Sequence, residues 1–289
     1  ETPMTPANTG AERSEMLQTL LRDGADDPRV SPLAARRLIR SGNYTGQTAG
    51  MAMGRLQGNL AILPKDLALD FAIFCHRNPK PCPVVAMTAP GDPMLPDIGV
   101  DVDIRTDAPQ YNVYRHGELD TQVTDLSDLW QDDFVGFVLG CSFSFEDALV
   151  KAGIGLRHHE MEVTVPMYAT NIACRPVGPF QGNTVCSMRP MTPKDALRAI
   201  EITSRFPAAH GAPLHFGDPA EIDITDVMAP EWGDAVDIKA GEIPVFWACG
   251  VTPQLVLQTA KPPICITHTP GAMLIGDQAS DAVSMRWSA

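Results

Sequence analysis

The stretch VFWACGVTPQLVLQTAKPPICITH, residues 245–268, decides the fold. A first apolar run ends at Cys249, Thr252-Pro253 has the form of a helix start, and a second apolar run ends at His268. This order predicts a strand, a helix and a second strand parallel to the first. The carboxyl ends of such strands share one edge of a sheet, where α/β proteins place ligands. We therefore expect Cys249 and His268 to lie along that edge.

The remainder of the chain alternates between helix and strand patterns. Cap residues and apolar periodicity predict helices over residues 12–23, 32–41, 64–77, 144–152 and 252–260, and another that starts at 193. Short apolar runs predict strands over residues 83–88, 134–139, 162–166, 184–188, 243–248 and 262–267. We therefore expect an α/β fold with parallel strand pairs.

The overall charge argues against several function classes. The chain carries 22 Lys and Arg against 35 Asp and Glu, a formal net charge of -13, and it has no basic run. Nucleic acid and anionic membranes are therefore not expected as partners, whereas a few local Arg residues suffice to bind a small anionic substrate. Seven Cys without a C-x-x-C motif indicate reduced thiols. With no apolar run of ~20 residues and no signal-peptide pattern, we expect a cytoplasmic protein.

The predicted sheet edge at Cys249 supports two interpretations. With Thr252 as N-cap, amide N–H groups beside Gly250 would be free to bind a carboxylate. The same helix N-terminus would lower the pKa of the Cys249 thiol and favour a nucleophilic thiolate. In the alternative interpretation Cys249 is a packed core thiol and Thr252 only satisfies its own helix.

The segment LGCSFSFEDAL, residues 139–149, has the same plan of strand end, turn and helix. Ser142 follows the strand end and is placed to hydrogen-bond a substrate carboxylate. Ser144 is best explained as a helix cap. Glu146 in the first turn either complements the helix dipole or is a catalytic carboxyl.

The segment SRFPAAHGAPLHFGDP, residues 204–219, is the densest polar stretch. It contains Arg205, His210, His215 and Asp218. Such a loop is able to ligate a divalent metal or to hold a general base. A third clear ligand is lacking, and the adjacent pair His158-His159 is a weak metal signal. We therefore assign no metal ligands. The sequence requires no cofactor, although a divalent metal is compatible with it.

Several long motifs, in order along the chain, resemble the D-glutamate cyclase-like family. They include IRSGNYTGQTAG, GNLAILP, FCHRNPKPCP, GCSFSFEDAL, SMRPMTP, RFPAAHGAPLHFGDP and PVFWACGVTPQ, and the resemblance extends over residues 36–277. The resemblance implies a hydro-lyase that cyclises D-glutamate to 5-oxo-D-proline with loss of water. One departure is Ala272, which stands where the family motif PGHM has a His.

The resemblance also implies an architecture. It predicts a three-layer α/β main domain formed by residues 1–109 and 189–289. A smaller α+β domain over residues 110–188 interrupts it. A change of composition near residue 109 is consistent with the first of these boundaries.

Cyclisation needs an amine that loses a proton, an electrophilic carboxyl group, donors for the oxygen charge and an acid for the leaving oxygen. We assign Arg189 or Arg205, with Ser142, to substrate carboxylates. The candidate base is His215 or His268. The remaining candidates are Asp218 or Glu242 as acid or orienting group, Cys249 as thioester nucleophile or lining residue, and His210, Gly250 and Thr252 as substrate contacts.

Two alternative functions stay open at this stage. One is a hydro-lyase that acts on another small carboxylic acid with the same groups. The other is a non-catalytic binder of small carboxylates, which Ala272 makes more credible. The expected partner in each case is a small-molecule carboxylate, and a homo-oligomer is compatible with the sequence.

Overall fold

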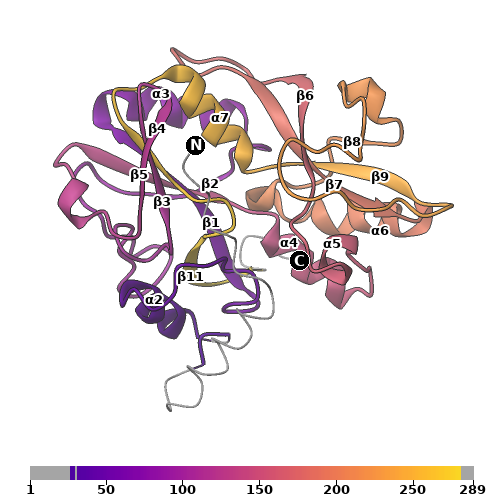
Figure 1. Cartoon of the computed structure of the whole chain (residues 1–289), viewed down its shortest axis with the longest axis horizontal. Helices are drawn as coiled ribbons and strands as arrows, with labels where there is room; N and C mark the ends of the chain where they lie inside the picture. The colour runs from indigo at the N-terminus through magenta and orange to yellow at the C-terminus, as the bar shows by residue number, and fades with distance from the viewer. Residues whose placement is uncertain (1–26, 30, 281–289) are drawn as a thin grey trace, which may run out of the picture.

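The computed structural model describes residues 27–29 and 31–280, which form two lobes, each built on its own β-sheet (Figure 1). The large lobe has a seven-stranded sheet and the small lobe a four-stranded sheet. Among the described helices, none has the length and apolar character that a membrane span requires. The helix expected over residues 12–23 lies outside the described residues.

The large sheet is built around one central strand. Its strands are β1 (Arg55–Pro64), β2 (Val84–Met87), β3 (Tyr111–Arg115), β4 (Glu118–Val123), β5 (Phe134–Gly140), β10 (Cys265–His268) and β11 (Leu274–Ala279). Their order is β2-β5-β1-β10-β3-β4, and β11 also pairs with β1. The central strand β1 is buried almost throughout, as expected for a strand covered on both faces.

The small sheet has the order β6-β7-β9-β8. Its strands are β6 (Met167–Ala173), β7 (Asn183–Met191), β8 (His215–Phe216) and β9 (Ile243–Ala248). The longest pairing joins β7 to β9, from Cys186 opposite Ala248 to Met191 opposite Ile243. It forms the centre of the small lobe.

Six α-helices and three 3-10 turns complete the described fold. The α-helices are α2 (Pro32–Arg40), α3 (Lys65–Arg77), α4 (Phe143–Lys151), α5 (Arg157–Glu160), α6 (Pro193–Thr203) and α7 (Val251–Ala260). The 3-10 turns are η1 (Ser127–Leu129), η2 (Pro207–Ala209) and η3 (Pro219–Ile222). Two helix starts follow the sequence prediction: Ser31 Oγ accepts from the Ala34 amide, and Thr192 Oγ1 accepts from the Asp195 amide.

Each sheet packs side chains on both faces, although the edge strand β4 of the large sheet is exposed. On one face of the large sheet, α3 and α7 contribute Phe71 and Leu257 to a core that includes Phe137. A long loop covers the other face with side chains such as Leu95 and Ile104. In the small lobe, α4 and α6 pack on the face that carries Trp247, and loop residues pack on the face that carries Phe246. The second face of each sheet is thus covered by loops.

The chain passes between the lobes at two neighbouring points. At the first crossing, residues 140–142, it leaves β5 of the large sheet and enters α4 of the small lobe. At the second crossing, residues 248–250, it leaves β9 of the small sheet and enters α7, which packs on the large sheet.

Both crossings require a glycine for close approach. A Cβ on Gly140 would lie 1.6 Å from the Ala208 carbonyl oxygen. A Cβ on Gly250 would lie 2.3 Å from Asn59 Nδ2. Asn59 also donates to the Gly140 carbonyl at 3.0 Å, so one side chain of the central strand contacts both crossings.

The expectation of parallel strand pairs is wrong, because every pairing between named strands of the described residues is antiparallel. The strands on either side of α7 do not share a sheet: β9 belongs to the small sheet and β10 to the large one. Residues 162–166 are not a strand; β6 begins at Met167. The sheets also divide the chain at residues 141 and 250, whereas boundaries at 110 and 188 would cut through both sheets.

Candidate active site

The crossings bring Cys141 and Cys249 close enough to interact electrostatically. Burial raises the pKa of the Cys141 thiol to about 12 and also raises the pKa of Cys249. The amides of Gly250 and Val251 at the start of α7 act in the opposite direction on Cys249, but burial outweighs them. The lowered thiol pKa expected from the sequence is therefore wrong, and Cys249 is a protonated thiol at neutral pH.

A buried ion pair lies beside the first crossing. Arg189 of β7 donates from Nε (3.0 Å) and from Nη2 to Glu146 Oε1 of α4. It also donates to Ser187 Oγ at 3.0 Å and to Ser142 Oγ at 3.2 Å. The guanidinium carbon lies 5.2 and 5.3 Å from the centroids of two aromatic rings. Arg189 and Ser142 are thus occupied by the protein itself, which does not favour their expected role as carboxylate binders.

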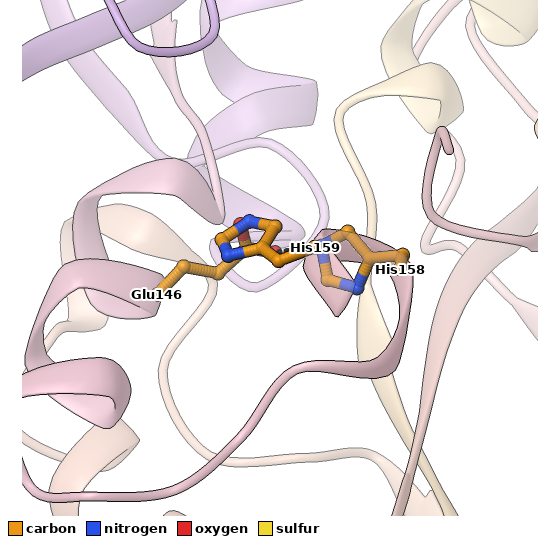
Figure 2. Close-up of side chains that lie close together, drawn as sticks. All are labelled: Glu146, His158 and His159. Atoms are coloured by element: carbon orange, nitrogen blue, oxygen red, sulfur yellow. Dashed lines mark hydrogen bonds and ion pairs between the residues drawn. The ribbon is translucent and has the colours of Figure 1, made fainter. Parts of the chain in front are cut away.

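Two adjacent histidines of α5 lie beside this ion pair (Figure 2). His159 Nε2 lies 3.2 Å from Glu146 Oε2, and His158 Nε2 lies 3.4 Å from Glu146 Oε1. Burial opposes ionisation of Glu146, but the charge of Arg189 and the two imidazoles outweigh it and hold the pKa of this carboxyl well below its usual range. Glu146 is therefore an anion at neutral pH.

His268 and Gln254 supply neutral polar groups at the second crossing, while Arg189 and Glu146 also act electrostatically on Cys249. His268 at the end of β10 accepts at Nδ1 from the Leu60 amide at 3.1 Å, and the Gln254 amide lies 3.5 Å from the same nitrogen. Burial lowers the pKa of His268 to about 4. Because Nδ1 accepts a hydrogen bond, the proton of the neutral ring is on Nε2. His268 is thus a hydrogen-bond donor at neutral pH and not the base that the sequence suggested.

A cation and an imidazole from different lobes meet near the crossings. Lys80 follows α3 in the large lobe, and its carbonyl accepts from His210 Nδ1 of the small lobe at 2.7 Å. This bond leaves His210 Nε2 with the free lone pair, and burial lowers the pKa of His210 to about 4. Lys80 Nζ donates to the Ala212 carbonyl at 2.5 Å, and no carboxylate of the described residues forms an ion pair with it. Lys80 interacts electrostatically with Cys186, which also interacts with Cys249.

Thr252 does not cap the helix as expected. The N-cap of α7 is Gly250, without a side-chain cap. Thr252 Oγ1 instead accepts from the Val185 amide of β7 at 2.9 Å and thereby attaches α7 to the small sheet. The first turn of α7 contains no acidic side chain; its Gly250 and Val251 amides interact with the Cys249 thiol, and the Thr252 amide donates to the Cys249 carbonyl at 3.0 Å.

Four predicted site residues lie away from the crossings. His215 Nε2 is 2.8 Å from the Asp218 carbonyl, and the Asp218 carboxylate caps η3. Glu242 accepts from Arg157 Nη2 at 2.6 Å, and Arg205 forms an exposed pair with Glu201. Each of these side chains satisfies a local contact, and the structure does not bring them together with Cys249.

Two cavities lie in the described part of the chain, one beside the second crossing and one within the small lobe. One of about 220 Å³ lies between β6, β7 and α7 and is lined by Thr170, Asn183 and Val185 among others. The other, of about 170 Å³, is lined by several acidic side chains, including Glu160 and Glu242. The first adjoins the second crossing, because the Val185 carbonyl accepts from the Cys249 amide.

Sequence reasoning missed Lys80 and Asn59 and gave little weight to the two histidines of α5. Lys80 lies in NPKPCP and Asn59 in GNLAILP, both within the motifs that carry the family resemblance. Neither position has a chemical signature of its own, so only their place in those motifs could have identified them.

Comparisons with known proteins agree with the resemblance. Residues 135–277 match the D-glutamate cyclase family. A protein of Methylobacterium sp. named "Putative hydro-lyase" is 56% identical over 260 residues, which cover 90% of this chain and 97% of that protein. Proteins with the same description from Bordetella pertussis (58% identical; 84% of this chain, 88% of that protein) and Jannaschia sp. (59%; 86% and 94%) are equally similar. A nitrogen repressor-like protein from Methanococcus jannaschii aligns over 81% of this chain and 90% of that one, at 9% identity, with a TM-score of 0.34.

Proposed function

The chain belongs to the D-glutamate cyclase family, and we propose that it is a lyase that cyclises D-glutamate to 5-oxo-D-proline with loss of water at the junction of its two lobes. The observation that carries this proposal beyond the family is Lys80. It is a half-buried cation near the crossings, and among the described residues it has a carbonyl partner but no acidic one. A substrate carboxylate would supply the missing charge.

The neighbouring groups suit the proton transfers that the reaction needs. The ammonium nitrogen of D-glutamate gives up two protons in total and forms a bond to the γ-carboxyl carbon. One γ-carboxylate oxygen receives two protons, its bond to that carbon breaks, and it leaves as water. His210 Nε2 has the free lone pair to accept the proton of the amine, because Nδ1 is held by the Lys80 carbonyl.

Stabilisation of the developing oxyanion is assigned to the second crossing. The amides at the start of α7 and the Nε2–H of His268 are neutral donors, and the first turn of α7 has no acidic side chain that would repel an anion. Such fixed donors are suited to the charge of a tetrahedral intermediate. The substrate itself brings amine and carboxyl together, since both belong to one molecule.

The test is incubation of the purified protein with D-glutamate, with chiral chromatography and mass spectrometry of 5-oxo-D-proline. L-Glutamate is the stereochemical control. Lys80→Met is expected to lower kcat/KM on the order of 10- to 100-fold, the effect of losing one charged hydrogen bond to substrate. Lys194→Met, at an exposed position on α6, is the matched control and should keep wild-type kinetics. If the wild type forms no product from D-glutamate and does not hydrolyse 5-oxo-D-proline, the proposed reaction is wrong.

A second candidate reaction follows from the name of the relatives, which is hydro-lyase without a substrate. Elimination of water from a small hydroxy acid would use the same carboxylate binder and proton acceptor. A panel of hydroxy acids assayed by absorbance of the unsaturated product tests it. Turnover of a panel member, combined with no turnover of D-glutamate, would favour this reaction over cyclisation.

A further inference from the structure

Glu146, His158 and His159, which we call the Glu146 cluster, form a group of side chains that the proposed reaction does not use (Figure 2). One ligand atom from each residue lies within 4.8 Å of the other two. The residues come from two separate helices, α4 and α5, so the fold and not local sequence brings the carboxylate to the imidazoles. Two imidazoles and one carboxylate are a donor set that suits a divalent transition metal.

The spacing of the donor atoms fits a shared ion. Two ligands that each lie about 2.1 Å from a tetrahedral or octahedral ion are about 3.0 to 3.5 Å apart. The observed separations are 3.2 Å between Glu146 Oε2 and His159 Nε2, and 3.4 Å between Glu146 Oε1 and His158 Nε2. Both imidazole–carboxylate separations lie in this range, and one ligand atom from each of the three residues lies within 4.8 Å of the other two.

The second observation is an unsatisfied nitrogen. His158 Nε2 is buried and has no hydrogen-bond partner among the described residues, although it faces Glu146. The side chain is only 5% exposed, so bulk water does not solvate it. Buried polar atoms of native proteins are almost always paired, and a metal bond would satisfy this lone pair.

The residues around Glu146 fix the orientation of its carboxylate, which a metal ligand needs. Arg189 donates twice to Oε1, which fixes the orientation of the group and leaves Oε2 facing His159. Hydrogen bonds from residues outside the ligand set commonly fix the orientation of metal ligands. The His159 side chain is 50% exposed, so water or a small carboxylate is able to reach the remaining coordination positions.

We propose that Glu146, His158 and His159 bind one divalent first-row transition ion, with Zn²⁺ and Co²⁺ as the ions to test, and leave at least one coordination position open to solvent. Nitrogen donors disfavour Mg²⁺ and Ca²⁺, which prefer oxygen ligands. This proposal does not depend on the cyclase reaction, because it concerns binding of the ion alone.

The experiment uses the full-length protein without a histidine tag, treated with a chelator and then titrated with ZnCl₂ by calorimetry. A second titration with CoCl₂ is followed by visible absorption. We expect one ion per chain and a Co²⁺ spectrum without the near-ultraviolet thiolate band, since the cluster contains no Cys. His159→Ala should weaken Zn²⁺ binding at least about tenfold, because it removes a ligand and not an outer-shell partner. His159 is half-exposed, so this variant is expected to fold.

One control variant and one further ligand variant accompany His159→Ala. His76→Ala removes an exposed histidine of α3 and should bind Zn²⁺ like the wild type. His158→Ala, checked for folding by circular dichroism, should weaken binding as His159→Ala does. The proposal is overturned if the wild type binds no Zn²⁺ or if His159→Ala binds it unchanged. A Co²⁺ spectrum with a thiolate band would also overturn it, because the ion would then be bound by cysteines. These readouts do not involve turnover, so they remain informative if cyclisation of D-glutamate fails.

Discussion

The two crossings have the same local plan but opposite electrostatic character. Each consists of a strand end, a Gly–Cys or Cys–Gly pair and a helix N-terminus. At the first crossing the helix start is surrounded by ionised groups, Glu146 and Arg189, with two imidazoles beside them. At the second crossing the polar groups are neutral: a thiol, an amide side chain and the imidazole of His268.

This difference separates two kinds of chemistry within one junction. Ionised groups in fixed positions suit proton exchange or metal binding, whereas neutral donors at a helix N-terminus suit an oxyanion. Changes at each crossing should therefore have distinct effects, and the following predictions are ordered by expected size.

The largest effect is expected from the ion pair of the first crossing. Arg189→Met leaves the Glu146 carboxylate buried without its main partner and should lower the free energy of unfolding by about 3 to 5 kcal/mol. Urea denaturation measures this. The double variant Arg189→Met with Glu146→Leu should recover part of the loss. Arg205→Met, in an exposed pair, should cost at most about 0.5 kcal/mol. Equal losses in Arg189→Met and Arg205→Met would contradict the view that the buried ion pair is the more important of the two.

The next largest effect is the pH dependence of stability that His268 causes at the second crossing. Burial lowers the pKa of His268 from 6.5 to about 4, so folding favours the neutral ring. The contribution of His268 to the free energy of unfolding is fully present above pH 6.5. It is lost as the pH falls from 6.5 towards 4, which lowers the free energy of unfolding by about 3 kcal/mol. The pKa of Glu146 is depressed below its usual range, so its contribution to the free energy of unfolding is lost only at a pH below the range in which His268 titrates.

Urea denaturation between pH 4 and pH 7 tests this difference. His268→Gln should show a smaller loss of stability over that range than the wild type. The matched control His76→Gln, at an exposed position, should follow the wild-type curve. A wild-type stability that is flat from pH 6.5 to pH 4.5 would disprove the assigned state of His268.

Smaller losses are expected from the glycines, and the two crossings should again differ. Gly250→Ala places a methyl group against the Asn59 side chain and should cost about 1 to 3 kcal/mol. In an Asn59→Ala background this cost should fall, because the opposing amide is absent. Gly140→Ala meets the backbone carbonyl of Ala208, so its cost should stay high in the same background. A double-mutant cycle measured by thermal unfolding separates the two.

The smallest effect is expected at Cys249. Its raised pKa makes it a protonated lining thiol, so Cys249→Ser should change turnover by less than about tenfold. A nucleophile would lose several orders of magnitude. The measurement is kcat for the substrate that the wild type converts, and Cys265→Ser, in the core of the large lobe, serves as a folding control. Loss of all activity in Cys249→Ser alone would restore the thioester interpretation.

Local signals in the sequence predicted local structure well. The helices α2 and α6 begin at the expected caps, because a Ser or Thr side chain, a following Pro and the helix amides lie within four residues. The strands β5, β9 and β10 also lie close to their predicted ranges. Their partners could not be predicted, because the pairing of strands depends on contacts between distant residues.

The same limit explains the outcome for the site. Cys249 and His268 were expected at one edge of a parallel sheet, and this is wrong, because α7 connects strands of two different sheets. Arg189, Ser142 and His210 were selected for their chemistry and do lie near the crossings. Their hydrogen bonds, which decide whether each is free for a ligand, involve residues up to 130 positions away.

The passage of the chain at two adjacent points has a mechanical consequence. A lobe joined by one link rotates freely about it, whereas a lobe joined by two neighbouring links is restricted to turning about the line through them. The turn between β6 and β7 restricts even this motion, because its residues Cys174 and Phe180 are buried with Phe71 in the core of the large lobe. The two lobes are thus joined at two crossings and at one packed turn, so the groups beside Cys141 and Cys249 are held at fixed mutual distances.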